Sequence, residues 1–273
     1  MSATRLDRLS ALVDGLAPVV TLTTDPAATD QDAAPDHGLV VYLLSAGALR
    51  LHRAGTVTDV QAPALVALQA RAPHHLEHLA SPPAARLICA RTELTGPVAP
   101  LFLQEFAEPR VLSLVDDEPA LRLAISMIEL ELGAPRCGQP ALLKRVGDIL
   151  FIGLLRHLVA HPSPGGTGLF NGLADPRIAK ALVAMHQHPE ADWSLERLAQ
   201  EAGLSRTAFA ATFRRVMRQT PGKYLSALRL ALAQRAVERG KGLKEAARIA
   251  GYGNASALSR SLSRARQRRM VTA

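Results

Sequence analysis

The C-terminal half of the chain contains the same helix-glycine-helix pattern twice. The first copy turns at Gly203 and the second at Gly251, and each glycine stands between two runs of apolar residues at helical spacing. Glycine adopts the left-handed backbone conformation that such a tight turn requires. The apolar positions are Leu195, Leu198, Ala199, Ala202, Phe209, Phe213 and Val216 in the first copy, and Leu243, Ala246, Ala247, Ala250, Leu258, Leu262 and Ala265 in the second. This duplication predicts an all-α domain with two helix-turn-helix units.

Capping residues and a long connecting segment support the same prediction. Ser194 and Ser205 stand where helix N-caps are expected, and Asp175 with Pro176 combines a capping side chain with a proline at the first helical position. Residues 221–239 predict a helix of roughly 28 Å between the two units, at about 1.5 Å per residue. A helix of that length would set the second helices of the units about 34 Å apart, about one turn of B-DNA.

The two halves of the chain carry opposite net charges. Residues 1–160 contain 13 Lys and Arg against 17 Asp and Glu, a net charge of −4, whereas residues 161–273 contain 19 against 7, a net charge of +12. A compact piece with that much positive charge repels itself unless a polyanion neutralises it. Nucleic acid is such a partner, because its neutralised phosphates release condensed counterions. The charge therefore favours nucleic-acid binding over a merely solvated basic surface.

Short apolar or alternating runs, separated by glycine and proline, dominate residues 38–94. They predict the β-strands of a small barrel or sandwich, and Gly47 separates the first two at hairpin spacing. The runs are LVVYLL (39–44), ALRLHR (48–53), ALVALQA (64–70) and ARLICAR (85–91). Before them we expect a short amphipathic helix at the N-terminus, not a signal peptide, and a polar loop over 23–37.

Two apolar stripes at helical spacing follow within residues 118–160. The first consists of Leu121, Ile125, Ile128 and Leu132, which are spaced 4, 3 and 4 residues apart. Such spacing is typical of a coiled-coil seam. The second stripe lies within 142–159, and the connection GAPRCGQP makes the pair a predicted helical hairpin. The first stripe would either face a second subunit in a homodimer or pack onto the strands, and the sequence leaves both open.

Composition marks a domain boundary near residue 160. The segment HPSPGGTG (161–168) has the composition of a linker, and the net charge changes sign there. We therefore predict an α+β protein. Its parts are a small β-barrel with the hairpin over 1–160, a linker over 161–171 and the double helix-turn-helix domain over 172–273. The longest apolar run, 149–155, is far shorter than the about 20 residues of a membrane span.

Three segments of the basic half carry a family resemblance: LAQEAGLSRTAFAATFRR, TPGKYLSALRLALAQ and AARIAGYGNASALSRSLSR. Residues 172–265, which contain them, resemble the DNA-binding domain of AraC/XylS-family transcription regulators. Residues 20–160 resemble the cupin-like sensor domain of one branch of that family, through the strands, RLICAR and the helical hairpin. The resemblance implies a cytoplasmic, dimeric regulator that responds to a small-molecule effector, binds double-stranded DNA sequence-specifically and can contact RNA polymerase.

The resemblance also assigns candidate DNA contacts. Positions 207, 210 and 211 are the base-facing ones of the first unit, and two of them are alanine, which can contact only a thymine methyl group. In the second unit, Arg260 is the best candidate for paired hydrogen bonds to a guanine. The predicted set is Ser205, Arg206, Thr207, Ala210, Ala211, Arg214, Arg215, Asn254, Ser256, Ser259, Arg260 and Arg264. Of these, Arg206, Arg214, Arg215, Asn254 and Arg264 would hold the DNA backbone, and for each arginine the alternative is a solvated charge.

The second unit departs from the family pattern. Leucines stand at 258 and 262, where phenylalanine is usual, and the chain ends in RARQRRMVTA instead of continuing with Gly, Pro and Tyr-Arg after Arg264. We therefore expect a last helix that is short or weakly anchored, with a basic tail on DNA.

The first half of the chain contains few side chains that could form a metal site or a redox-active site. His74, His75, His78 and Glu77 could bind a metal, but a strand would divide them between its two faces, so we expect no metal site and no cofactor. Cys89 lies in an apolar strand and is expected to be a buried structural thiol, not a redox sensor. With only two cysteines, neither a disulfide framework nor a zinc site is expected, and a reducing cytoplasm is the default.

No set of residues demands catalysis, so we expect no enzyme and no catalytic residues. An effector pocket is expected in the mouth of the barrel, with no residues assigned to it. Two alternatives remain open: a cupin-type metalloenzyme whose basic half is incidental, and an architectural DNA-binding protein without an effector.

Overall fold

The computed structural model describes residues 7–24, 37–79, 84–114, 119–162 and 165–272. Contacts divide them into two compact units: one contains residues 17–95 and 103–158, and the other contains residues 7–16, 96–102 and the described chain from 159 onward. The polar loop expected over 23–37 lies mostly outside the described residues. No described helix combines the length and the apolar character that a membrane crossing would need.

Two antiparallel sheets form the first unit. The larger has the strand order β1-β7-β2-β5-β8 and the smaller β4-β3-β6. Their bounds are β1 Pro18–Thr23, β2 Gly38–Ala46, β3 Ala48–Arg53, β4 Thr56–Gln61, β5 Ala64–Gln69, β6 His75–His78, β7 Arg86–Leu94 and β8 Arg110–Ser113. One apolar core draws on both sheets, with Tyr42 of β2, Leu51 of β3 and Cys89 of β7 among its members. The described strands therefore form two packed antiparallel sheets that do not close into a barrel. The sequence predicted a small barrel or sandwich, and the structure has the sandwich arrangement.

Gly47 does not make the expected hairpin. Strand β2 pairs with β5 and β7, and β3 pairs with β4 and β6, so Gly47, with φ 76°, carries the chain from one sheet to the other. The hairpin comes at the next turn, where Ala54 (φ 45°) and Gly55 (φ 79°) join β3 to β4. Two consecutive positive φ angles are typical of a type I′ hairpin turn.

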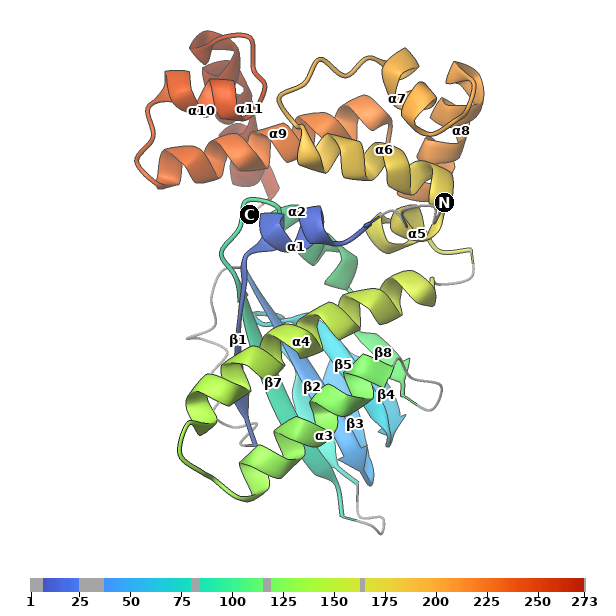
Figure 1. Cartoon of the computed structure of the whole chain (residues 1–273), viewed down its shortest axis with the longest axis vertical. Coiled ribbons are helices and arrows are strands. Elements are labelled where there is room, and N and C mark those ends of the chain that lie inside the picture. The colour runs from blue at the N-terminus through green and yellow to red at the C-terminus, as the bar shows by residue number, and fades with distance from the viewer. Residues whose placement is uncertain (1–6, 25–36, 80–83, 115–118, 163–164, 273) are drawn as a thin grey trace, which may run out of the picture. The chain divides into compact units, whose positions relative to one another are not determined.

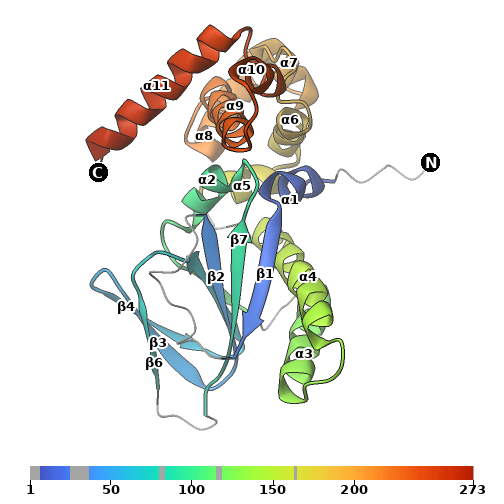
Figure 2. The ribbon, with the colours of Figure 1, turned by 90° about the vertical axis from the view of Figure 1, so that its left-hand side faces the viewer.

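Helices α3 (Pro119–Gly133) and α4 (Gln139–Ala160) form the predicted helical hairpin and cover the face of the larger sheet that lies opposite the smaller sheet (Figure 2). Glycines allow the close packing. A Cβ on Gly147 of α4 would lie 2.9 Å from the Cβ of Val20 in β1, and a Cβ on Gly153 would lie 3.3 Å from the Cβ of Leu121 in α3. Helix α4 therefore packs directly on β1, and α3 packs on α4.

The apolar stripe predicted on α3 is mostly turned inward. Leu121 and Ile128 are buried within the unit, so the stripe packs against its own chain and the intersubunit alternative is wrong for these residues. A different set of large apolar side chains on α3, namely Leu123, Met127 and Leu130, is exposed.

The other compact unit, which includes the described chain from 159 onward, consists of helices. Helix α9 runs between the pair α7 and α8 at one end and the pair α10 and α11 at the other (Figure 1). The bounds are α1 Ser10–Leu16, α2 Ala99–Leu103, α5 Leu169–Ala174, α6 Pro176–Gln187, α7 Leu195–Glu201, α8 Arg206–Met217, α9 Pro221–Glu238, α10 Leu243–Ile249 and α11 Ala255–Thr272.

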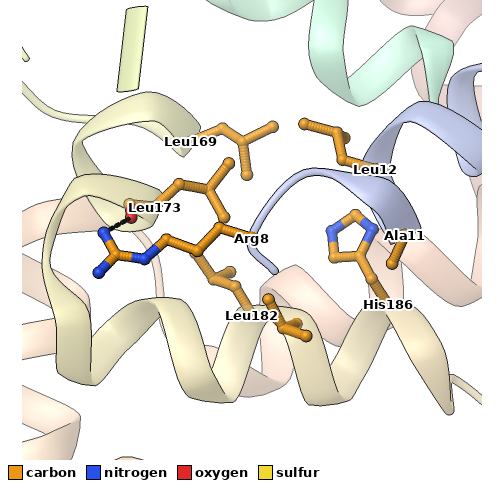
Figure 3. A pocket seen from close by; sticks show the side chains of 8 residues that line it. Arg8, Ala11, Leu12, Leu169, Leu173, Leu182 and His186 are labelled. Atoms are coloured by element: carbon orange, nitrogen blue, oxygen red, sulfur yellow. Dashed lines mark hydrogen bonds between the residues drawn. The ribbon is translucent and has the colours of Figure 1, made fainter. Parts of the chain in front are cut away.

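The predicted N-terminal helix, α1, packs with the C-terminal helices. Just before it, Arg8 donates from Nη1 to the carbonyl oxygens of Leu173, at 2.9 Å, and Ala174, at 3.3 Å. Leu12 of α1 lines a small pocket together with His186 of α6 and leucines of α5 and α6 (Figure 3). The expected division at residue 160 assigns α1 to the first domain, whereas its contacts lie with the unit that carries the helix-turn-helix pairs.

Candidate nucleic-acid interface

Local capping builds the first helix-turn-helix unit, α7 and α8. The Oγ of Ser194 accepts a hydrogen bond from the N–H of Arg197 at 3.1 Å, and the Oγ of Ser205 accepts one from the N–H of Ala208 at 3.3 Å. Gly203 makes the turn with φ 64°. Phe209 and Phe213 of α8 are fully buried and Val216 is nearly so, which leaves the opposite face of the helix to solvent.

The second unit, α10 and α11, has the same plan with smaller parts. Gly242 occupies the N-cap of α10 and has no side chain to accept a hydrogen bond. Asn254 caps α11, because its Oδ1 accepts from the N–H of Ala257 at 2.8 Å. The core here consists mainly of alanines with the buried Leu258, and Leu262 is only partly buried.

Helix α9 connects the two units and also contacts the loop that precedes the first. Arg229 of α9 donates from Nε to the carbonyl oxygen of Pro189 and from Nη2 to that of Ala191, both at 2.7 Å. Gly251 lies against the same loop, because a Cβ on it would come within 2.6 Å of the Cα of Glu190. These contacts fix the position of the second helix-turn-helix unit relative to the first. The sequence does not signal them, because the acceptors are backbone carbonyls about 40 residues away.

A histidine-tyrosine contact ties α6 to α9. The Nε2 of His186 lies 2.7 Å from the hydroxyl oxygen of Tyr224. Desolvation lowers the pKa of His186 to about 4, because an apolar environment disfavours the charged imidazolium. Sequence reasoning singled out neither residue.

The predicted DNA contacts lie on the outer faces of α8 and α11. Ala210 is partly buried, and the other predicted residues are exposed. The exposed residues are Ser205, Arg206, Thr207, Ala211, Arg214, Arg215, Asn254, Ser256, Ser259, Arg260 and Arg264. Both helices therefore present a polar face of the predicted composition.

Several of these side chains also have intramolecular partners. Ser205 and Asn254 are engaged as helix caps. Arg206 pairs with Glu196 of α7 at 2.8 Å, and the Nη2 of Arg264 lies 3.4 Å from the Oγ of Ser261. Arg206 would have to give up this carboxylate in order to contact a phosphate.

The last helix is longer than the sequence suggested. α11 runs from Ala255 to Thr272, so the expectation of a short helix is wrong. Arginine and glutamine are good helix formers, and RARQRRMVT continues the helix without the glycine and proline that are usual in the family.

The histidines His74 and His52 of the sheet-containing unit make contacts within the fold. The Nε2 of His74 lies 2.7 Å from the hydroxyl of buried Tyr42, and its Nδ1 lies 2.7 Å from the carbonyl oxygen of Ala72. Burial lowers the pKa of His74. His52 lies 2.9 Å from Glu77 across β3 and β6. Within the described parts of the chain, no three His, Cys, Asp or Glu side chains are grouped to hold a metal ion.

Cys89 is the buried thiol that its strand predicted. Its side chain lies in the shared core of the two sheets, and desolvation raises its pKa to about 12. A thiol with so high a pKa is protonated at neutral pH and reacts slowly with oxidants.

Each half of the chain matches a known protein family. The sequence pattern of the family described as Cupin matches residues 7–160, and that described as Helix-turn-helix domain matches residues 198–268. A putative AraC-like transcription regulator of Streptomyces lividans is 31% identical over 155 residues, which cover 55% of this chain and 51% of that protein. The chain thus spans about half the length of this relative.

Two further proteins are similar over more of the chain. The RCS-specific HTH-type transcriptional activator RclR of Escherichia coli K12 is 27% identical over 202 residues, covering 72% of this chain and 70% of its own. The crystal structure of ToxT from Vibrio cholerae O395 aligns over 89% of this chain and 91% of its own, with 8% identity and a TM-score of 0.37. The chain belongs to the cupin family and carries a C-terminal helix-turn-helix domain of the type found in AraC-like transcription regulators.

Proposed function

We propose that the protein is a transcription regulator that binds double-stranded DNA sequence-specifically and responds to a small-molecule effector. One observation carries the proposal: two helix-turn-helix units present exposed polar faces in the part of the chain with net charge +12. The cupin-like region, within 1–160, is the proposed sensor. It is joined through 161–171 to the proposed reader, 172–273. Such a regulator acts where the chromosome is, so we place it in the cytoplasm.

We infer that base discrimination comes mainly from α11. Arg260 is exposed there, beside Ser256 and Ser259, and an arginine can donate two hydrogen bonds to one guanine. On α8 the exposed Thr207 and Ala211 offer one hydroxyl and two methyl groups, which discriminate weakly. The arginines at 214 and 215 are assigned to phosphates.

Arg260→Ala tests this division of labour. The variant should lose preference for one base pair by about 1–3 kcal/mol, measured as binding to a selected duplex and its single-base variants at several salt concentrations. Arg248→Ala on α10 is the matched control, since Arg248 is also exposed but lies outside the recognition helix. An unchanged sequence preference in Arg260→Ala would remove Arg260 from the reading role. Absence of salt-dependent binding by the wild type to any duplex would overturn the proposed function.

We further propose that the protein is a homodimer that uses the outer face of α3. Leu123, Met127 and Leu130 are 67%, 44% and 63% exposed and, spaced 4 and 3 residues apart, share one face of the helix. Two linked readers would bind adjacent half-sites more tightly through effective concentration, and the bound dimer could contact RNA polymerase. Leu130→Glu should convert the dimer to a monomer in sedimentation measurements. A monomeric wild type would contradict the proposal.

A further inference from the structure

A cleft beside the C-terminal end of α8 brings three arginines together with the linker. Its lining includes Gly166 and Thr167 of the linker and the three arginines Arg214, Arg215 and Arg218. The N–H of Gly168 donates to the carbonyl oxygen of Val216 at 2.9 Å. This bond holds the linker against the last turn of α8.

The lining of the cleft is strongly cationic. Among the described residues, none that lines it is acidic. Three guanidinium groups around one cleft repel each other, and a bound anion would relieve that repulsion. The planar, multiply donating guanidinium group matches phosphate oxygens well.

We propose that this cleft binds a backbone phosphate of duplex DNA, so that the linker itself forms part of the DNA contact. The inference rests on the proposed function and extends the phosphate contact assigned there to Arg214 and Arg215 to Arg218 and to the linker. Helix α8 has 12 residues and is therefore about 18 Å long, longer than the roughly 12 Å width of the major groove. Its last turn thus reaches the sugar-phosphate backbone when its first turns meet the bases. Ala211, a predicted base-facing position, also lines the cleft, so the cleft opens on the same side.

Arg218→Asn is the test variant. Arg218 has φ 55°, and asparagine is among the residues that tolerate this left-handed conformation. The change therefore removes the charge without adding backbone strain. Arg239→Asn is the matched control, because Arg239 is exposed, ends a helix of the same unit and lies outside the cleft.

Binding of the full chain to a selected duplex and to a random duplex is measured between 0.05 and 0.5 M KCl, roughly the range over which phosphate contacts dominate the salt dependence. Arg218→Asn should reduce the slope of log affinity against log salt by about 0.9, which corresponds to about a tenfold loss near 0.1 M salt for both duplexes. Arg239→Asn should keep the wild-type slope. A wild-type slope in Arg218→Asn, or equal losses in both variants, overturns the inference and leaves the proposed function intact. Failure of the wild type to bind any duplex overturns the proposed function instead.

A second variant does not depend on Arg218. Gly166→Asp places a carboxylate beside the arginines and should weaken binding to both duplexes by at least as much, with the melting temperature showing that the protein still folds. A measurement with inorganic phosphate shows whether the cleft binds a phosphate of DNA or free phosphate. If it raises the melting temperature of the wild type but not of Arg218→Asn, while the slope for DNA is unchanged, the cleft binds free phosphate and the inference is overturned.

Discussion

Both helix-turn-helix units turn at a glycine with positive φ, yet their surroundings differ. Gly203 stands in open space, whereas Gly251 lies against the loop that precedes the first unit. Beneath α8 the rings of Phe209 and Phe213 are 5.6 Å apart, and Phe213 also lies 6.1 Å from Tyr224. Beneath α11 the buried side chains are alanines and Leu258, and larger side chains such as Leu262 pack there only partly buried. The same motif is therefore stabilised by aromatic packing in one copy and by close backbone approach in the other.

This difference predicts unequal effects of truncating equivalent core side chains. Phe213→Ala should lower the free energy of unfolding by about 3–5 kcal/mol, because a fully buried ring leaves a large cavity. Leu262→Ala, at the matching position of the second unit, should cost no more than about 2 kcal/mol, because Leu262 is partly exposed. Urea unfolding of the full chain measures both. Equal losses would show that the second core is packed as tightly as the first.

Acid should weaken the α6-α9 contact. The pKa of His186 is about 4 in the folded chain and about 6.5 when unfolded, so the unfolded chain binds the extra proton between these values. Stability therefore falls as pH drops from about 6.5 to 4, by up to about 3 kcal/mol, and is unaffected by this group at higher pH. His186→Gln should flatten this part of the profile in urea unfolding at successive pH values. A profile as steep as that of the wild type would assign the acid sensitivity to other groups.

The two turn glycines allow the most direct comparison. Gly203→Ala should cost about 1–2 kcal/mol, the penalty for a left-handed alanine. Gly251→Ala should cost at least about 1 kcal/mol more, because its Cβ would also meet the Cα of Glu190. Thermal unfolding of the two variants side by side provides the measurement. If Gly203→Ala were the more damaging, the close approach at Gly251 would not stabilise the second unit.

Sequence reasoning worked best where the signals are local. The caps at Asp175, Ser194 and Ser205 mark the starts of α6, α7 and α8, because each acts on a backbone N–H two or three residues ahead. It failed at β4, five of whose six residues are exposed, since such a strand has no apolar run to detect. It also failed at Gly47, where a glycine at hairpin spacing leads to the other sheet.

The amino-acid order alone was enough to establish the duplicated helical unit, its capping residues and the division of charge, because spacing, capping and composition operate within a few turns of chain. The pairing of β2 with β7, the attachment of α1 to α6, the anchoring of α9 by Arg229 and the cleft between the linker and α8 exist only in the folded chain. Each of these joins segments that are far apart along the chain, and their contacts depend on surfaces that exist only once both partners have folded.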